Sequence, residues 1–323
     1  MTMSPPARTA DPAELTHRAA ALVANVERVV RGRRAAVELV VAAVLAGGHA
    51  LLEDVPGSGK TTLARAVARS VGGRFQRIQA TSDLLPADLT GSGVWNPHQQ
   101  TFEFVPGPLF ANVVLADELN RTTPRTQSAL LEAMEEGAVT VDGHRHPLPD
   151  PFFLVATQNP VEQHGTYPLP EGQLDRFTVR VRLGDLDPAA ERLVVREQLA
   201  RATVDDLGPV LSPGELRALR AGVREVFVAD PVLDHAVTLV RATRGDARVL
   251  LGASSRAAIA LVRCAQARAV LGGREYVAPD DVRALAVPVL AHRLVLAPGA
   301  GTGHRAEELV AELVARVPVP VVT

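Results

Sequence analysis

A short run of glycine, hydroxyl and lysine residues carries the groups needed to hold a triphosphate. The run is Pro56-Gly57-Ser58-Gly59-Lys60-Thr61-Thr62, and it lies between a short apolar segment and a helical pattern. In such a loop the glycines let successive backbone N–H groups turn toward phosphate oxygens, and the start of the following helix adds positive potential. Lys60 can reach the outer phosphates, and the Thr61 hydroxyl can ligate Mg²⁺. We therefore expect this loop to bind ATP together with Mg²⁺.

Lys60 is also unusual because the chain has no other lysine. Lysine and arginine together number 34, so 34 − 1 = 33 of them are arginine. A compact ammonium on a flexible stem is not equivalent to a planar guanidinium where backbone must wrap closely around one charge. The loop departs from the strict pattern at Asp54, where the first glycine would stand, but aspartate tolerates unusual backbone angles better than most residues. The alternative, a glycine-rich turn with a solvated lysine, does not account for the strand, loop and helix context.

Two adjacent carboxylates end a second apolar run. Asp117 and Glu118 directly follow Val113-Val114-Leu115-Ala116. Asp117 can hold Mg²⁺ through water, and Glu118 can orient and deprotonate an attacking water. A glutamate that activates water favours hydrolysis over transfer to a substrate hydroxyl, and so an ATPase over a kinase. The alternative is that the pair only caps the helix that begins near Thr123.

A further polar residue, Asn159, follows the apolar run 152–156. Ligands bind at the carboxyl ends of strands in a parallel sheet, so Asn159 could reach the γ-phosphate or its attacking water. Asn159-Pro160 is also a common turn sequence, and that alternative stays open.

These residues require strands that end side by side in one sheet. Short apolar runs bounded by turn residues alternate with helical patterns in the first part of the chain, which argues for a parallel sheet covered by helices. Two segments, 94–104 and 139–143, read instead as hairpin insertions, the second with an Asp-Gly turn. The expected strands are 50–52, 75–78, 113–116, 152–156 and 179–183, and the expected helices are 12–31, 35–46, 61–71 and 125–136.

After Leu183 the strand signals stop and helical patterns continue. A capping box begins at Ser212, Asp230-Pro231 marks another helix start, and segments 254–270 and 279–291 are helical. The C-terminal part is therefore expected to be all-helical. We predict a flexible tail over 1–12, a nucleotide-binding domain over 13–186 and a helical lid domain over 187–323.

Composition limits the classes of protein that fit. The chain has 323 residues, a net charge of −2 and 47% hydrophobic residues, so it offers no global attraction for nucleic acid or an anionic membrane. Cys264 is the single cysteine, which suits a reducing compartment. The N-terminus lacks a secretion signal, and the most apolar early stretch, 35–52, is interrupted by polar residues and glycines. A cytoplasmic protein without a membrane span is expected.

Five segments, in this order, make the chain resemble the MoxR family of AAA+ ATPases. The resemblance extends from about residue 20 to residue 310. It implies an α/β fold in which a P-loop domain with a parallel five-stranded sheet, sandwiched by helices and carrying hairpin insertions, precedes an all-helical lid. The segments are the Gly57 to Thr62 loop, Asp117-Glu118-Leu119-Asn120-Arg121, Ala156-Thr157-Gln158-Asn159-Pro160, Leu174-Asp175-Arg176-Phe177 and Gly252-Ala253-Ser254-Ser255-Arg256.

The same resemblance assigns roles to two arginines. Arg176 would be an arginine finger that reaches the nucleotide of a neighbouring subunit and neutralises charge as the γ-phosphate leaves. Arg256, which opens a helix of the C-terminal part, resembles sensor 2, through which the lid contacts phosphate. A cation at the start of a helix is mildly unfavourable, which supports an anion nearby. The alternatives are a surface pair of Asp175 with Arg176 and a solvated first-turn Arg256.

The resemblance also implies partners. The protein is expected to be a Mg²⁺-dependent ATPase that forms a ring of copies of itself, a hexamer, and remodels or matures a client protein or metal-enzyme complex. In this family the usual partners are proteins with von Willebrand factor A domains. Two alternatives stay open: a magnesium-chelatase-type motor subunit, and a nucleotide-gated binding scaffold with little turnover. A nucleic-acid motor is disfavoured because no basic run with interleaved aromatic residues is present.

Overall fold

The structure is a computed structural model of the 323-residue chain, and it describes residues 11–54, 57–158, 166–199, 204–298 and 305–320. Its centre is a parallel sheet of five strands in the order β2-β5-β8-β1-β9, so β1, which precedes the glycine-rich loop, lies inside the sheet. β5 is buried along its whole length, as expected for a parallel strand with both faces covered. The strands are β1 (Ala50–Glu53), β2 (Phe75–Gln79), β5 (Val113–Asp117), β8 (Phe153–Gln158) and β9 (Val179–Val181).

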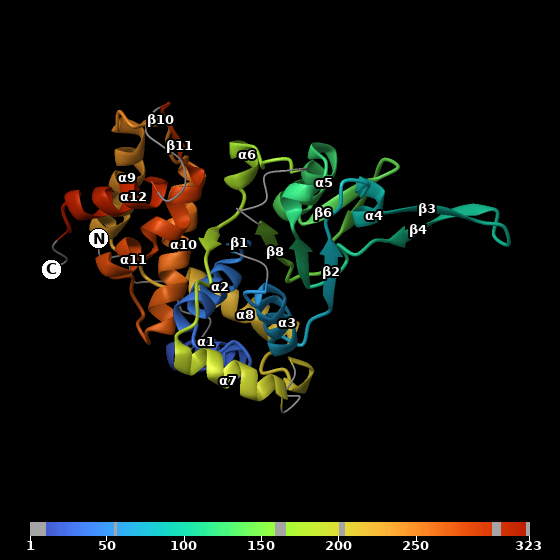
Figure 1. Cartoon of the computed structure of the whole chain (residues 1–323), viewed down its shortest axis with the longest axis horizontal. Helices are drawn as coiled ribbons and strands as arrows, with labels where there is room; N and C mark the ends of the chain where they lie inside the picture. The colour runs from blue at the N-terminus through green and yellow to red at the C-terminus, as the bar shows by residue number, and fades with distance from the viewer. Residues whose placement is uncertain (1–10, 55–56, 159–165, 200–203, 299–304, 321–323) are drawn as a thin grey trace, which may run out of the picture.

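Successive residues of these strands serve two apolar cores, one on each face of the sheet. Ala50 and Leu52 of β1 belong to a large core shared with α1, α2 and α3, whereas Leu51 belongs to a second core that includes residues of α5. Helices thus cover both faces, which confirms the predicted sandwich (Figure 1). The helices are α1 (Pro12–Glu27), α2 (Arg34–Ala46), α3 (Lys60–Ser70), α4 (Pro86–Thr90), α5 (Pro124–Glu136) and α6 (Glu171–Leu174).

The C-terminal part is a bundle of helices that packs on the same large core. Ser212 and Glu215 form the predicted capping box at the start of α8. One amendment to the all-helical prediction is needed, because β10 (Val249–Leu251) and β11 (Val295–Leu296) form a small antiparallel pair. The helices of this part are α7 (Pro188–Leu199), α8 (Pro213–Arg224), α9 (Asp230–Gly245), α10 (Ser255–Leu271), α11 (Pro279–Leu290) and α12 (Arg305–Arg316).

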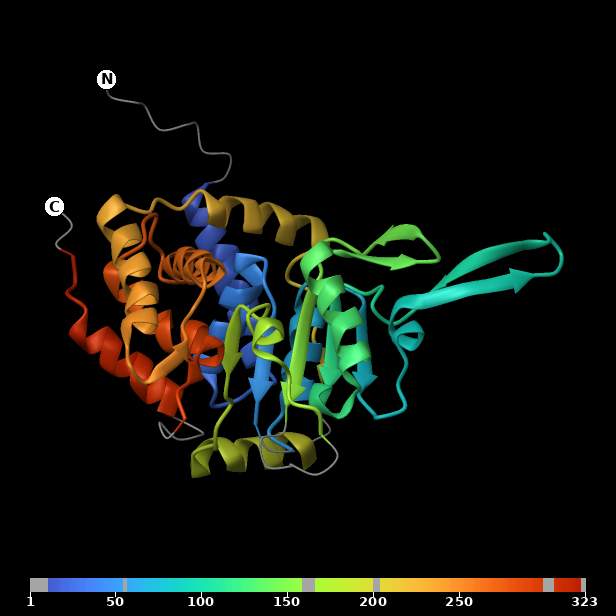
Figure 2. The same cartoon turned by 90° about the horizontal axis from the view of Figure 1, so that it is seen from above.

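Both predicted hairpins are present and project from the same side of the body (Figure 2). Their strands touch through Phe104 of β4, whose ring stacks on His146 of β7 at a centroid distance of 3.8 Å. Trp95 and Phe102 form an exposed edge-to-face pair on the longer hairpin. The hairpins are β3 (Gly91–Asn96) with β4 (Thr101–Pro106), and β6 (Ala138–Val141) with β7 (His144–Pro147).

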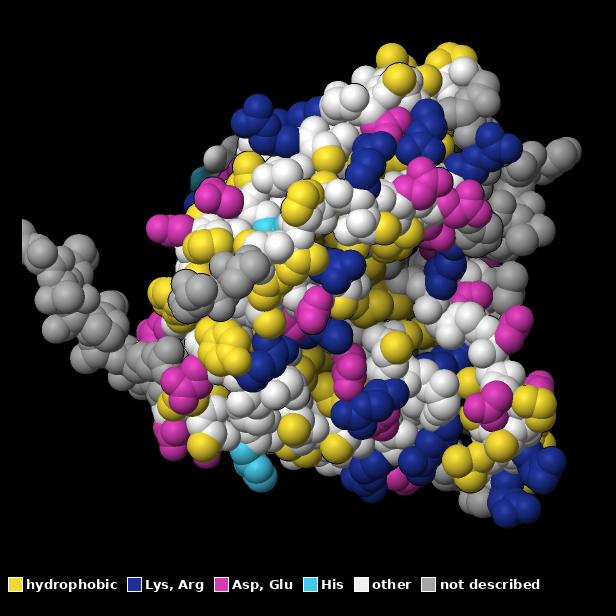
Figure 3. All heavy atoms as spheres, turned by 90° about the vertical axis from the view of Figure 1, so that its left-hand side faces the viewer, with side chains coloured by type: hydrophobic (Ala, Val, Ile, Leu, Met, Phe, Trp, Pro, Cys, Tyr) yellow, Lys and Arg dark blue, Asp and Glu magenta, His cyan; other side chains and the backbone are white. Residues whose placement is uncertain are grey.

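The surface of the C-terminal bundle mixes charges of both signs. In Figure 3 the arginines lie among aspartates, glutamates and groups of apolar side chains, and no broad patch of one sign covers this face. This distribution agrees with a net charge of −2. Among the described residues, no helix has the length and apolar character that a membrane span requires.

The division of the chain into a tail, residues 1–12, a domain over 13–186 and a lid over 187–323 stays a prediction. The first ten residues lie outside the described part, and Asp11 caps α1 by accepting a hydrogen bond from the Ala13 N–H at 3.0 Å. Residues of both predicted domains contribute to the large core, which joins α2 to α10.

A buried histidine directly before β1 makes stability depend on pH. His49 is 7% exposed, lies 3.1 Å through Nε2 from the Met134 carbonyl, and accepts the Leu154 N–H through Nδ1 at 3.0 Å. A proton added to Nδ1 would face that N–H, and burial lowers the pKa of His49 to about 4. An unfolded histidine has a pKa of about 6.5, so the unfolded chain binds the extra proton first as pH falls.

We therefore expect the free energy of unfolding to fall between pH 6.5 and pH 4, with His49 contributing up to about 3 kcal/mol of the loss. Burial also lowers the pKa of His292, so the wild type carries a second contribution of the same sign. Urea denaturation of the wild type and of His49→Gln at pH 7.5 and pH 5 isolates the His49 share, because the variant should show the smaller pH dependence. An NMR titration that places the His49 imidazole near pKa 6.5 in the folded protein would contradict this result whether or not the variant folds.

Candidate functional site

The glycine-rich loop leaves β1 and enters α3 with the backbone shape of a phosphate cradle. Gly57 and Gly59 have φ angles of +81° and +92°, which residues with a side chain rarely adopt. A Cβ atom on either glycine would meet nothing within 4 Å, so the backbone conformation, not lack of space, requires glycine here. Lys60 is the first residue of α3, and its Nζ donates to the Asp54 carbonyl oxygen at 2.7 Å.

The residues of this loop fit a triphosphate. The Ser58 Oγ is buried and has no hydrogen-bond partner among the described residues. Its carbonyl oxygen accepts a hydrogen bond from Arg33 in the α1–α2 connection, which brings a second cation to the loop. The N-terminus of α3 adds its positive end at Lys60 and Thr61. Pro56, also predicted to contact the nucleotide, lies outside the described residues, and Thr62 follows Thr61 in the first turn of α3.

The two predicted carboxylates lie at the carboxyl end of β5, two strands away from the loop, with β8 between them. Thr157 of β8 fixes both: its hydroxyl donates to the Asp117 Oδ1 at 2.6 Å and accepts the Glu118 backbone N–H at 2.8 Å. Glu118 has a φ of +57°, an uncommon value for a residue that carries a side chain. The order β5-β8-β1 therefore brings the acidic pair and the loop to one edge of the sheet.

Polar side chains of β2 hold the free ends of these carboxylates. Arg77 donates to the Asp117 Oδ2 at 2.6 Å, and the Gln79 Nε2 donates to the Glu118 Oε2 at 2.9 Å. Arg121 contacts the same Glu118 oxygen at 3.2 Å. Each carboxylate is thus held in place by a side chain of β2, the strand on the other side of β5 from the loop, and Asp117 is 8% exposed.

The two predicted arginines lie together, but at a different place. Arg176 and Arg256 both bind Glu135 near the end of α5, at 3.2 Å and 2.5 Å respectively. The three residues line a pocket of about 280 Å³ that also includes Gly48 and His49, which precede β1. The glycine-rich loop follows the other end of β1. The arginines therefore lie at the amino edge of the sheet, about 13 Å of strand away from their own phosphate loop.

The C-terminal bundle positions this arginine pair. Asp175 accepts hydrogen bonds from Ser254, which precedes α10, at 3.0 Å and from Arg293 at 2.8 Å. Arg293 also donates to the Phe177 carbonyl at 2.7 Å, and burial lowers the pKa of its guanidinium while Asp175 opposes that change. The segment that carries Arg176 is therefore fastened to the same bundle that carries Arg256.

The predicted site residues lie in two separate places. The structure brings the loop, Asp117 and Glu118 together, and it brings Arg176 and Arg256 together at the opposite edge. Asn159 lies outside the described residues. Sequence reasoning missed the residues that orient these groups: Arg33, Arg77, Gln79, Glu135, Thr157 and Arg293. Only Thr157 carried a signal, as a hydroxyl residue within the motif that precedes Asn159.

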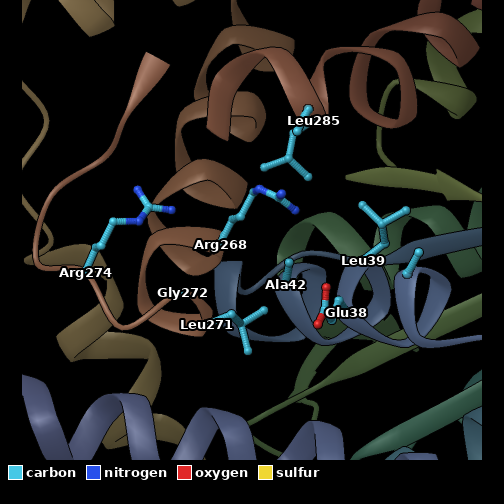
Figure 4. Close-up of a pocket in the computed structure, with 10 residues that line it drawn as sticks. Glu38, Leu39, Ala42, Arg268, Leu271, Gly272, Arg274 and Leu285 are labelled. Carbon is cyan, nitrogen blue, oxygen red and sulfur yellow. The ribbon is translucent and has the colours of Figure 1, made fainter. Parts of the chain in front are cut away.

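A second hollow, of about 310 Å³, lies between α2, α10 and α11 (Figure 4). Arg268 and Arg274 line it, and both pair with Asp281. Glu38, on the facing helix, pairs with Arg34. The charges of this hollow are thus matched within the chain, and none of the residues assigned to nucleotide binding lines it.

A glycine-rich phosphate loop, an acidic pair two strands away and a helical lid together define an ATPase of the AAA class. Comparison with known proteins supports this class directly. The family model described as "ATPase family associated with various cellular activities (AAA)" matches residues 49–179, and an AAA lid domain model matches residues 241–313.

Relatives place the chain more narrowly. It is 50% identical over 300 residues to the uncharacterized protein YeaC of Bacillus subtilis, covering 93% of this chain and 94% of the relative. It is 39% identical to the chaperone MoxR1 of Mycobacterium tuberculosis, covering 91% and 80% of the two chains. A crystal structure of an ATPase candidate from Cytophaga hutchinsonii superposes with a TM-score of 0.88 at 36% identity, covering 96% and 97% of the two chains. The chain belongs to the MoxR family of AAA+ ATPases.

Proposed function

We propose that this ATPase hydrolyses ATP with Mg²⁺ at the subunit interfaces of a ring. The arginines of one subunit would contact the nucleotide bound by its neighbour, and the protein would use the hydrolysis cycle to remodel a partner protein. The observation that supports this proposal most is the separation of the two arginines from their own phosphate loop. Arg176 and Arg256 share one pocket at the amino edge of the sheet, whereas Lys60 and Glu118 lie at the carboxyl edge.

At the carboxyl edge the chain supplies the groups that hydrolysis needs. Lys60 would leave the Asp54 carbonyl for the outer phosphates, and Thr61 with Asp117 would hold the metal. Bound Mg²⁺ supplies charge neutralisation across the phosphates. Glu118, held by Gln79, would orient a water and accept its proton, and Asn159 is proposed to contact the γ-phosphate or that water.

The arginine pocket is the proposed donor face of the subunit interface. A guanidinium placed beside a neighbour's γ-phosphate stabilises charge that develops in the transition state. In the single chain Glu135 forms ion pairs with both guanidinium groups. Glu135 is thus the anion near the N-terminus of α10, where a negative charge is favourable. A neighbour's triphosphate would compete with Glu135 for the same cations.

Hydrolysis would be transmitted to clients through the lid. Asp175 and Arg293 join the Arg176 segment to the helical bundle, so a change at the subunit interface moves the bundle with it. We infer a hexameric ring in the cytoplasm, a partner with a von Willebrand factor A domain, and a client protein or metal-enzyme complex as the object of remodelling. The name of the relative called chaperone MoxR1 supports the client role. A pull-down with the Glu118→Gln variant tests the client role. The variant should retain a partner protein in the presence of ATP and release it in the presence of ADP.

The interface proposal is tested by mixing two inactive variants. Arg176→Ala keeps an intact phosphate loop but donates no finger, and Glu118→Gln keeps the finger but lacks the base. Each alone should lose at least about 100-fold in phosphate release. A 1:1 mixture should recover up to about a quarter of wild-type activity, the share of interfaces that combine both intact halves in a randomly mixed ring.

Arg145→Ala is the matched control, because Arg145 is an exposed arginine that pairs with Glu136, the last residue of α5. It should retain wild-type turnover. Sedimentation of the mixture establishes that the two variants assemble together. No recovery from a mixture that does assemble, or full activity of Arg176→Ala alone, would show that Arg176 does not act across an interface.

A further inference from the structure

Asp54 stands where the strict phosphate-loop pattern has glycine, and its side chain has a partner of its own. The Asp54 Oδ2 accepts the backbone N–H groups of Leu183 and Gly184 at 2.9 Å and 3.0 Å. The β1–β9 ladder has its last paired residues at Leu52 and Val181. The Asp54 carboxylate thus adds hydrogen bonds between the ends of β1 and β9, beyond the last backbone pair of the two strands.

The backbone of the same residue holds the ammonium group of Lys60. The Asp54 carbonyl accepts the Lys60 Nζ at 2.7 Å. One residue therefore contacts the group proposed to bind phosphate and, through its side chain, the first residues after β9. Hydrogen bonds to an ionised acceptor are roughly twice as strong as neutral ones, so this connection is stiff.

The residues held by Asp54 begin the connection to the lid. Gly184 has a φ of +68°, which favours glycine and marks a sharp change of chain direction. Three residues later the Asp187 Oδ1 caps α7 by accepting the Ala189 and Ala190 N–H groups at 2.9 Å and 2.8 Å. α7 runs past the carboxyl edge of the sheet before the chain enters the bundle (Figure 2).

Ion pairs of Glu53, the residue before Asp54, strengthen the same connection between the ends of β1 and β9. Arg182 of the same segment binds Glu53 at 2.8 Å and Glu307 of α12 at 2.7 Å, and Arg180 binds Glu307 at 2.7 Å. The C-terminal helix is thereby tied to the ends of β1 and β9. Glu53 and Asp54 together fasten both the start of the lid connection and the last helix of the chain to the phosphate loop.

We propose that Asp54 is a positioning residue that couples the phosphate loop to the lid connection at Leu183 and Gly184. The inference rests on the proposed function, because it requires Lys60 to exchange the Asp54 carbonyl for phosphate when ATP binds. When Lys60 leaves, the Asp54 carbonyl loses this hydrogen bond and the Asp54 backbone can shift. The Asp54 carboxylate then transmits that shift to the N–H groups of Leu183 and Gly184. A glycine at this position would complete the strict loop pattern but would leave the amides without their acceptor.

Hydrogen exchange at residues 183–185 tests the coupling, measured with and without a non-hydrolysable ATP analogue and Mg²⁺. In the wild type the two amides should be protected, and the analogue should change their exchange rate. Asp54→Gly should bind the analogue within about threefold of wild type. Its amides should exchange at least about tenfold faster, with no response to nucleotide. Turnover should fall through kcat with little change in KM.

Two further variants separate coupling from loop structure. Asp54→Asn keeps an oxygen acceptor in place and should restore most of the protection and the nucleotide response. Asp185→Gly removes the exposed carboxylate next to Gly184 and should leave the response intact. Asp54→Gly amides that still respond to the analogue would overturn the inference, as would a loss of nucleotide affinity that matches the loss of kcat. A wild type that binds no nucleotide would instead overturn the proposed function.

Discussion

The Glu118→Gln variant is expected to bind ATP with near wild-type affinity and to hydrolyse it at least about 100-fold more slowly. The amide cannot accept a proton from water, but it can still contact Gln79, which now lies 2.9 Å from the Glu118 Oε2. The backbone N–H of residue 118 would keep its bond to the Thr157 hydroxyl, so the local fold should persist. Steady-state phosphate release and equilibrium nucleotide binding separate the two effects.

Glu132→Gln is the matched control for this change. Glu132 is an exposed carboxylate in the second half of α5, 14 residues after Glu118 in the chain. Its variant should hydrolyse ATP at the wild-type rate. Undiminished turnover of Glu118→Gln, measured in a preparation that Lys60→Ala shows to be free of contaminating ATPases, would remove Glu118 from the role of base.

The Lys60→Ala variant is expected to lose at least about 100-fold in nucleotide affinity. Lys60 is the ammonium aimed at the cradle formed by Gly57 and Gly59, and a charge-assisted bond to the outer phosphates would disappear with it. The fold should remain, because the Lys60 side chain is only partly buried and its Nζ donates to a backbone carbonyl oxygen. Titration with a fluorescent nucleotide measures the affinity, and thermal unfolding without nucleotide checks the fold.

Lys60→Arg distinguishes charge from shape. Every other residue with a permanent positive side-chain charge in this chain is arginine. A planar guanidinium does not fit a loop whose backbone closes around a compact ammonium group. We expect Lys60→Arg to bind at least about tenfold more weakly than wild type. An arginine variant with wild-type affinity would show that the loop recognises phosphate by charge alone.

Most of the fold and one half of the site could be predicted because they depend on local patterns. Alternating strands and helices, the loop between β1 and α3, and the acidic pair that ends β5 each lie within a few consecutive residues. The strand pair β10 and β11 escaped prediction because three-residue and two-residue strands are too short to show alternation. The helix α7 was not singled out, although Asp187-Pro188 is a start signal of the kind found at Asp230-Pro231. The helix α12 has no such pair directly before Arg305.

The other half of the site depends on contacts between distant segments. Glu135 looks like any exposed carboxylate on α5, and only the fold places it beside Arg256, 121 residues further along the chain. The pairing of Arg293 with Asp175 spans 118 residues and has no local signal either. Asp54 was recognised as an exception to a pattern, but its partners at Leu183 and Gly184 became visible only when β1 and β9 were side by side.

Every step proposed for this protein begins with the Lys60 loop holding ATP. Isothermal titration calorimetry of ATP and Mg²⁺ into the full chain examines that step without any assumption about rings, lids or clients. We expect a saturable heat with about one nucleotide per chain, and no such heat with Lys60→Ala. A folded wild-type protein that gives no heat with ATP, ADP or their magnesium complexes would contradict the assignment of the loop and with it the proposed function.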